Sequence, residues 1–138
     1  MSDPHDLSAF LDLGWQRLSR GVADRKAAAR HPVFATVSPD GMPEARTIVL
    51  RAADRETATL EVHTDGGSGK IRSLQAHPVA QLHVWDERVK LLIRATSSDW
   101  FTVLTCRLVD IELMQLGDPH RRAVFTRETD WSGQWLVP

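Results

Sequence analysis

The sequence has only one cysteine, no tyrosine and no excess of either charge sign. Cys106 has no second cysteine to pair with, which agrees with a reducing compartment. Seventeen basic and eighteen acidic residues give a net charge of −1, so the basic excess typical of nucleic-acid-binding proteins is missing. No apolar run is long enough to span a bilayer, and the first residues lack the basic and apolar regions of a signal peptide. We therefore expect a cytoplasmic protein that binds neither nucleic acid nor membrane.

What is present fits one folded domain over residues 1–138. The chain is long enough to bury a sizeable core, and 42% hydrophobic and 25% charged residues are ordinary values for a globular protein. Cys106 stands among aliphatic residues and is interpreted as a small core residue. Trp131 and Trp135 lie within the last eight residues. We expect this Trp-rich end to be docked, on its own subunit or on a partner.

Apolar residues at helical spacing predict a helix near the N-terminus. Its stripe comprises Leu7, Phe10, Leu11, Gly14, Trp15 and Leu18. Three residues near its start can cap it, namely Asp3, Asp6 and Ser8. Gly21 is expected to end this helix. A second short helix is predicted over residues 23–30, ending before Pro32 because the residue preceding a proline disfavours the helical conformation.

After Pro32 the pattern changes to short β-branched segments separated by tight turns. Residues 33–37, the turn at 38–41 and residues 43–52 predict a β-hairpin. Five further strands are predicted at 57–64, 79–85, 89–96, within 101–116 and at 121–126. A helix is predicted at 69–77 and a closing segment at 131–137. A doubly wound α/β fold is excluded because no helices fit between most strands. We predict a mainly β fold, an antiparallel split β-barrel of about six strands with N-terminal helices and one short helix after a loop.

Two stretches carry candidate chemistry, the strand with Arg46 and Arg51 and the glycine-rich loop over 65–70. The glycines allow close backbone approach to a ligand, and Lys70 lies in a first helical turn, where a cation opposes the helix dipole unless an anion is bound. A phosphate would supply that anion. The alternatives are charged strand ends that reach water and an ordinary surface loop. Arg46 and Arg51 fall on opposite faces of a regular strand, so without a bulge they would touch different parts of one ligand.

Five segments carry a resemblance to a known family, namely 43–51, 62–65 with Ser68 and Lys70, 78–85, 125–127 and 131–138. They resemble the pyridoxamine 5′-phosphate oxidase family of FMN-binding split barrels. The resemblance implies a homodimer that holds FMN at its interface and acts on a small-molecule substrate.

The same resemblance implies roles for individual residues. The implied cofactor-binding residues are Arg46, Thr47, Ile48, Val49, Arg51, His63, Thr64, Ser68, Lys70 and Lys90. Arg46 would contact the phosphate together with Ser68 and Lys70, and the strand 47–49 would line the isoalloxazine ring. Arg121 matches a residue that contacts the substrate phosphate. The histidines show no metal-like spacing, so no metal site is expected, and no catalytic residue is identified.

The sequence also departs from the family pattern at several positions. Gly69 stands in place of an arginine, Met114 in place of a tryptophan that closes over the flavin, and Val124 in place of an arginine. A helical excursion between Thr96 and Phe101 is reduced to four residues. We therefore expect an FMN-dependent oxidoreductase that is not a true pyridoxamine phosphate oxidase. The alternatives are a non-catalytic flavin-binding or apo barrel acting as a carrier, sensor or interaction protein, or a barrel that uses haem or a deazaflavin.

Overall fold

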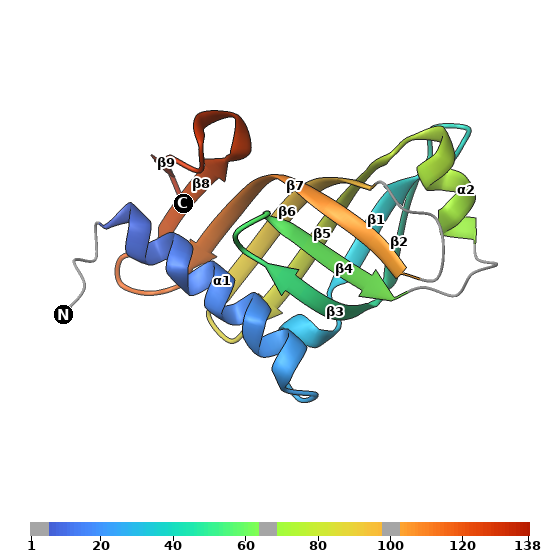
Figure 1. The fold of residues 1–138 in the computed structure, drawn as a ribbon. Coiled ribbons are helices and arrows are strands. Elements are labelled where there is room, and N and C mark those ends of the chain that lie inside the picture. The colour runs from blue at the N-terminus through green and yellow to red at the C-terminus, as the bar shows by residue number, and fades with distance from the viewer. Residues whose placement is uncertain (1–5, 64–68, 98–102) are drawn as a thin grey trace.

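The computed structural model describes residues 6–63, 69–97 and 103–138. Within these ranges the chain forms two α-helices, two short 3-10 helices and nine strands (Figure 1). In chain order they are α1 (Leu7–Ala23), η1 (Ala28–Arg30), β1 (Val33–Val37), β2 (Pro43–Thr47), β3 (Val49–Asp54), β4 (Thr59–His63), α2 (Gly69–Ala76), β5 (Val79–Asp86), β6 (Val89–Ser97), β7 (Val103–Gln115), β8 (Arg121–Thr126), η2 (Arg127–Thr129) and β9 (Gly133–Leu136). Neither described α-helix combines the length and the apolar character that a bilayer span requires.

One continuous stretch of chain, residues 43–54, closes the barrel. The strand order is β2-β1-β5-β6-β7-β4-β3, so β2 and β3 stand at opposite ends of the sheet although only Ile48 separates them in the sequence. Ile48 is 4% exposed, and its backbone N–H donates to the carbonyl of Pro32 at 3.1 Å. The single strand predicted over 43–52 is therefore two strands, because the chain changes its partner from β1 to β4 at Ile48.

The remaining strands confirm the predicted mainly β, antiparallel split barrel. β1 has the predicted bounds, and the helix predicted at 69–77 is α2. The described part of the chain has nine strands instead of about six, because the chain divides at Ile48 and because β8 and β9 extend the sheet beyond β7. In Figure 1, α1 crosses one end of the barrel, whereas α2 lies at the opposite end.

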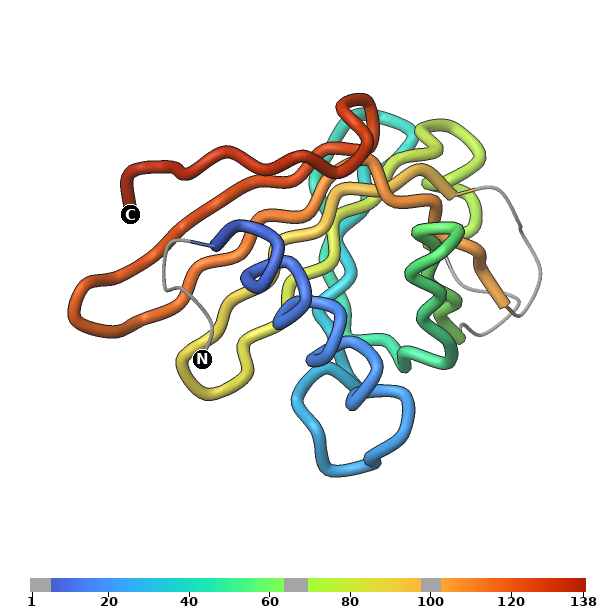
Figure 2. The backbone as a smooth tube through the Cα atoms, turned by 60° about the vertical axis from the view of Figure 1, so that its left-hand side comes forward, coloured from blue at the N-terminus to red at the C-terminus, as the bar shows by residue number. Residues whose placement is uncertain are grey.

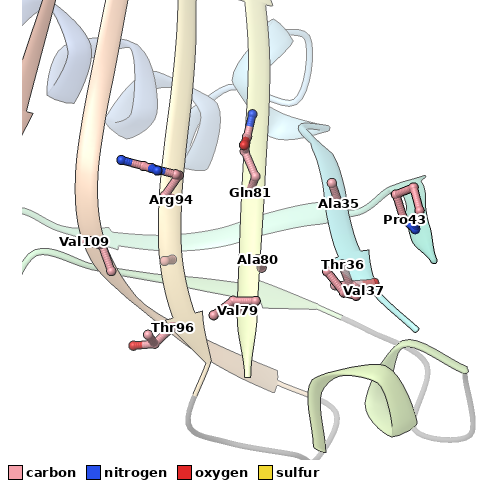
Figure 3. A pocket seen from close by; sticks show the side chains of 11 residues that line it. Ala35, Thr36, Val37, Pro43, Val79, Ala80, Gln81, Arg94, Thr96 and Val109 are labelled. Carbon is pink, nitrogen blue, oxygen red and sulfur yellow. The ribbon is translucent and has the colours of Figure 1, made fainter. Parts of the chain in front are cut away.

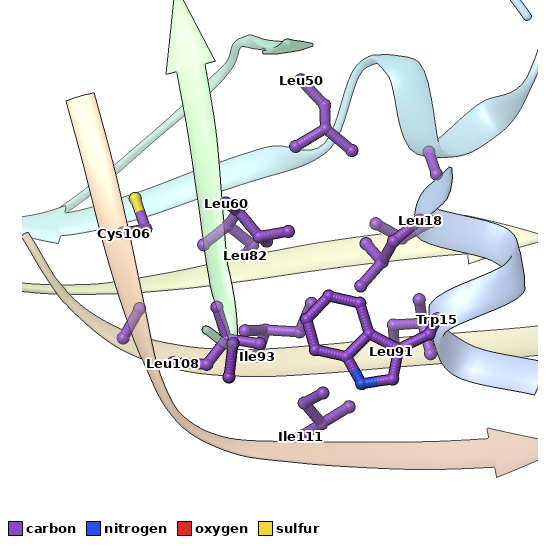
Figure 4. Packing of buried hydrophobic residues seen from close by; sticks show 14 of the residues in the cluster. Trp15, Leu18, Leu50, Leu60, Leu82, Leu91, Ile93, Cys106, Leu108 and Ile111 are labelled. Carbon is purple, nitrogen blue, oxygen red and sulfur yellow. The ribbon is translucent and has the colours of Figure 1, made fainter. Parts of the chain in front are cut away.

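The hydrophobic core fills the barrel and continues beneath α1. Figure 4 shows Trp15 and Leu18 of α1 packed toward Leu91 and Ile111 of the sheet. Leu18 is 1% exposed and Leu91 is fully buried, so the apolar stripe predicted for this helix is the face that it buries. Burying one such side chain contributes about 1.5–3 kcal/mol, and α1 is therefore part of the core.

The N-terminal helix begins as predicted but does not end where expected. Asp6 is the N-cap among the three candidates, and its carboxylate accepts hydrogen bonds from the backbone N–H groups of Ser8 and Ala9 at 2.9 and 3.3 Å. The prediction that Gly21 ends the helix is wrong, because α1 continues to Ala23. Gly21 serves packing instead. A Cβ at this position would lie 2.7 Å from the main chain of Ala29, a residue with no exposed surface.

The second helix predicted over 23–30 is also wrong. Ala23 belongs to α1, and only the 3-10 turn η1 follows. The carboxylate of Asp24 accepts a hydrogen bond from the backbone N–H of Lys26 at 2.9 Å, which turns the chain away from the helix axis. Nη1 of Arg30 then donates to the carbonyl of Val22 at 2.7 Å, folding the turn back onto α1. Local side-chain bonds therefore compete with helix formation over this segment.

The C-terminal segment docks on the rest of its own chain. The ring of Trp135 stacks on Phe10 of α1 with 5.4 Å between centroids, and Trp131 packs at the edge of the core. Figure 2 shows this last stretch of chain running beside β8. Cys106 is fully buried on β7, as predicted, and burial raises the pKa of its thiol to about 12. Its thiol is thus a packed core group.

Candidate site at the β1–β2 hairpin and helix α2

Arg46 is held against the hairpin formed by β1 and β2. The hairpin register places Arg46 opposite Phe34 and Glu44 opposite Thr36. Nη1 of Arg46 donates to Oγ1 of Thr36 at 2.6 Å and to the carbonyl of Phe34 at 3.3 Å. Thr36 is 3% exposed, whereas the Arg46 side chain keeps 24% of its surface accessible. Arg46 is therefore a fixed cation with one accessible edge.

Helix α2 is joined to the same hairpin by a polar contact. Oγ of Ser73 donates to Oε1 of Glu44 at 2.6 Å, and that carboxylate oxygen lies 3.7 Å from Nη2 of Arg46. Lys70 stands three residues before Ser73, and residues at this spacing are neighbours on a helix surface. The half-buried Lys70 in the first turn of α2 thus shares a face with the residue that contacts β2.

Arg46 and Arg51 lie in different surroundings, but the strand between them is not the regular strand that the parity argument assumed. Arg46 pairs with β1, whereas Arg51 lies after the break at Ile48 and is exposed. The register between β3 and β4 shifts between Leu50 and Ala52, which leaves Arg51 outside the pairing. Two irregularities therefore separate the two arginines, and each bends the strand locally.

The predicted ring-lining residues gather where β2 passes into β3. Thr47 is exposed, Ile48 is buried and Val49 is half-buried. His63, at the end of β4, is exposed and stands opposite Val49 in the register, so the structure brings these two predicted residues together. Thr64 and Ser68 lie outside the described residues. So do residues 98–100 of the shortened segment between Thr96 and Phe101.

Lys90 lies elsewhere on the chain. It is on β6, three strands from β2 by one route around the barrel and three strands from β3 by the other. Its register partners are Trp85 on β5 and Met114 on β7, and Met114 in turn pairs with Arg122 on β8. Lys90, a predicted cofactor-binding residue, and Met114 are therefore cross-strand neighbours on β6 and β7, remote in the sheet from Arg46 on β2 of the same chain.

Arg121 is engaged in contacts with Phe10 and Gln115 of its own chain. Its guanidinium lies over the ring of Phe10, 4.7 Å from the centroid, and its Nη2 donates to Oε1 of Gln115. The same Phe10 ring stacks on Trp135. The structure therefore places Arg121 in a cluster that fastens β8 and β9 to α1, away from the β1–β2 hairpin.

An apolar hollow of about 470 Å³ opens on the outer face of β1, β5 and β6 (Figure 3). Its lining includes Ala35, Val37, Val79, Thr96 and Val109. At its edge, Arg94 extends over β7 and binds the carboxylate of Asp110 through Nε and Nη2. These hydrogen bonds are the largest cause of a raised pKa of Arg94, and the negative charge of Asp110 is the second. Asp110 is 5% exposed, so a buried carboxylate fixes a largely exposed arginine beside an apolar surface.

Three residues around Arg46 were not predicted as site residues, namely Thr36 and Glu44 of the hairpin and Ser73 of α2. The sequence contains a signal for two of them. The turn at 38–41 sets the hairpin register, and that register pairs Thr36 with Glu44, next to the Phe34–Arg46 pair. Ser73 had no such signal, because its contact with Glu44 joins residues 29 positions apart in the sequence.

Comparison with known proteins identifies the family. Residues 13–102 match the family model described as "Pyridoxamine 5′-phosphate oxidase, FMN-binding domain". The chain belongs to this family of FMN-binding-domain proteins. The match includes the β1–β2 hairpin and α2.

A curated relative gives the same answer. The chain is 41% identical over 87 residues to a pyridoxine/pyridoxamine 5′-phosphate oxidase of Rubrobacter xylanophilus. The aligned region is 62% of this chain and 37% of the relative, so this chain spans little more than a third of that protein.

Solved structures show the same fold at low sequence identity. A pyridoxamine 5′-phosphate oxidase-related, FMN binding protein from Nostoc punctiforme has a TM-score of 0.78 at 20% identity, covering 96% of this chain and all of the other. PhzG from Burkholderia lata, solved with tetrahydrophenazine-1-carboxylic acid, has a TM-score of 0.67 at 17% identity, covering 99% and 95%. A heme binding protein from Mycobacterium smegmatis has 0.62 at 13%, covering 83% and 58%. At such identities the likeness concerns the fold alone.

Proposed function

We propose that this chain is a cytoplasmic, homodimeric FMN-binding protein that acts as a flavin-dependent oxidoreductase other than a pyridoxamine 5′-phosphate oxidase. Family membership supports the cofactor. The observation that carries the proposal is the anchored guanidinium of Arg46 beside the first turns of α2, where Ser73 joins the helix to β2. A phosphate monoester needs a fixed cation and oriented N–H donors, and this corner offers both.

The residues present fit the phosphate end of such a cofactor. Thr36 and the carbonyl of Phe34 hold Nη1 of Arg46, so the orientation of the guanidinium is fixed before an anion binds. Lys70 adds a second cation from the first turn of α2. The segment 47–49 and His63 would hold the ring, because their backbone lies where β2 leaves β1. When bound, FMN supplies hydride transfer to or from an organic substrate, and the protein supplies binding and orientation.

The outer face of the barrel supports a second copy as the partner. Four of the large hydrophobic side chains left exposed lie on this face, namely Val33, Val79, Trp85 and Val109, and each is 38–47% exposed. Val79 and Val109 also line the apolar hollow, and exposed apolar surface of this kind marks an interaction site. In the proposed dimer this face is covered, and Lys90 and Met114 of one subunit approach the cofactor held by the other.

Two observations support an activity other than pyridoxamine phosphate oxidation. Arg121, the residue matched to a substrate-phosphate contact, is engaged with Phe10 and Gln115. The position of the family's flavin-covering tryptophan holds Met114 between Lys90 and Arg122. A site changed in this way fits another substrate better than pyridoxamine phosphate.

The visible absorption spectrum tests the proposal first. The purified, untagged protein is recorded before and after loading with FMN and removal of the excess, and we expect a retained flavin spectrum. A protein that holds no flavin in either state contradicts the proposed cofactor, and a haem Soret band in its place identifies the other ligand seen in this fold. Turnover with pyridine nucleotides then separates an oxidoreductase from a non-catalytic flavin carrier.

A further inference from the structure

A carboxylate lies inside the cationic corner proposed to bind phosphate. Glu44 stands two residues before Arg46 on β2, and side chains at this spacing share one face of a strand. Its Oε1 lies 3.7 Å from Nη2 of Arg46, and its side chain is 38% exposed. A negative charge at this place works against an anionic ligand, so its presence needs a reason.

Glu44 is held in place from the opposite side. Oγ of Ser73 donates to Oε1 of Glu44 at 2.6 Å, and Ser73 is 1% exposed. The carboxylate therefore bridges β2 and α2, and it is not a surface group that turns freely toward water. Because Lys70 precedes Ser73 by three residues on α2, Glu44 lies on the side of the helix that also carries this second cation.

Arg46 does not need Glu44 for its orientation. Nη1 is fixed by Thr36 and by the carbonyl of Phe34, at hydrogen-bonding distances of 2.6 and 3.3 Å. The contact with Glu44 involves the other terminal nitrogen, Nη2, at a distance longer than a hydrogen bond. The carboxylate consequently faces the edge of the guanidinium that a phosphate oxygen would use.

We propose that Glu44 is a specificity-determining residue that acts as an internal counter-anion of Arg46. It lowers the net positive charge of the corner by one, so that a phosphate monoester is held more weakly than the two cations alone would hold it. The phosphate of the cofactor then contributes less to the affinity than the two cations would provide without Glu44. This inference rests on the proposed binding of FMN.

The test compares FMN with riboflavin, which has the same ring but no phosphate. In Glu44→Gln the amide oxygen still accepts from Ser73 at nearly the same volume, while the charge is removed. We expect the Kd for FMN, measured by quenching of flavin fluorescence, to fall about tenfold, equivalent to about 1.4 kcal/mol. The Kd for riboflavin should stay unchanged, and added salt should reduce the gain for FMN.

Control variants separate local charge from other causes. Glu56→Gln makes the same change of net charge at an exposed turn residue and should leave both affinities as they are. Ser73→Ala removes the bridge but keeps the carboxylate, and it should not tighten FMN. Glu44→Ala also removes the charge, so it decides the question if the glutamine variant does not fold.

Unchanged or weaker FMN binding in the folded uncharged variants, or an equal gain for riboflavin, overturns the inference. Absence of FMN binding in every protein, wild type included, overturns the proposed function itself.

Discussion

The hydroxyl of Thr36 accepts a 2.6 Å hydrogen bond from Nη1 of Arg46, and it does so from a position that is 3% exposed. The bond joins neighbouring strands of one hairpin and directs the guanidinium along the strands instead of out to water. A hydrogen bond to a charged group contributes about 1.5–3 kcal/mol. The position of the proposed phosphate ligand thus depends on a neutral side chain across the hairpin.

Replacement of Thr36 by Val should weaken FMN binding through loss of this bond. The change preserves the side-chain shape but removes the acceptor, so we expect the Kd for FMN to rise about tenfold, or 1.4 kcal/mol, with little effect on riboflavin. Fluorescence titration measures both constants. Thr36→Ser keeps the hydroxyl and should restore FMN affinity. Equal losses for FMN and riboflavin would show that Thr36 supports the fold alone.

Removal of both cations should abolish flavin retention. The double variant Arg46→Ala, Lys70→Ala leaves no side-chain cation at the proposed phosphate position among the residues assigned to it here. We expect the protein to lose its flavin spectrum after gel filtration while its far-UV circular dichroism stays the same. Arg51→Ala changes an exposed residue beyond the break at Ile48, and it should retain more flavin than the double variant does. Full retention by the double variant would rule out this corner as the phosphate site.

Introduction of a charge at Val109 should disrupt the proposed dimer. Val109 lines the apolar hollow and is 38% exposed, so a lysine is tolerated in the isolated subunit but loses its hydration when a second copy covers it. We expect Val109→Lys to run as a monomer in light-scattering chromatography at concentrations where the wild type is dimeric. Val137→Lys, at a residue that is 84% exposed, serves as the control. A dimeric Val109→Lys protein would place the interface on another face.

Substitution of Gly21 by Ala should destabilise the fold. The added Cβ would lie 2.7 Å from the main chain of Ala29, and overpacking of this kind costs about 1–3 kcal/mol. Gly14→Ala is the matched control in the same helix. Its Cβ would meet the flexible end of Leu113 at 3.2 Å, while alanine gains up to about 1 kcal/mol in helix propensity. Urea unfolding should therefore show a clear loss for Gly21→Ala and a small change of either sign for Gly14→Ala.

The stability of the protein should fall above pH 9 partly through Cys106. Its pKa is raised from 9.0 to about 12 in the folded protein, so its contribution is complete below pH 9 and declines as the pH rises toward 12. The decline is about 1.4 kcal/mol for each pH unit above the unfolded pKa. Urea unfolding between pH 8 and 10 should show a steeper loss for the wild type than for Cys106→Val. Parallel curves for the two proteins would contradict the assigned pKa.

Much of the fold follows from local patterns in the sequence. Alternation of apolar residues indicated the strands, and the turn at 38–41 set the register that puts Arg46 opposite Phe34, because a two-residue periodicity and a tight turn leave little choice of pairing. The family resemblance also rested on these local segments. The residues that hold Arg46, namely Phe34 and Thr36, therefore lie within the hairpin that the sequence predicted.

Contacts between distant segments decided the rest. The sequence could not show that the strand divides at Ile48, since the division arises from pairing with β1 on one side and β4 on the other. The neighbours of Gly21 in the sequence predicted a helix end. Its role is instead to leave room for the main chain of Ala29, which packs against it. The bridge from Ser73 to Glu44 and the hollow beside Val109 likewise depend on how far-apart elements pack. The sequence by itself determined most of the strand segments and the place of Arg46 in the hairpin, because these depend on near neighbours. Only the tertiary structure decided where the barrel closes and which carboxylate faces Arg46, because these depend on burial and on partners that are remote in the chain.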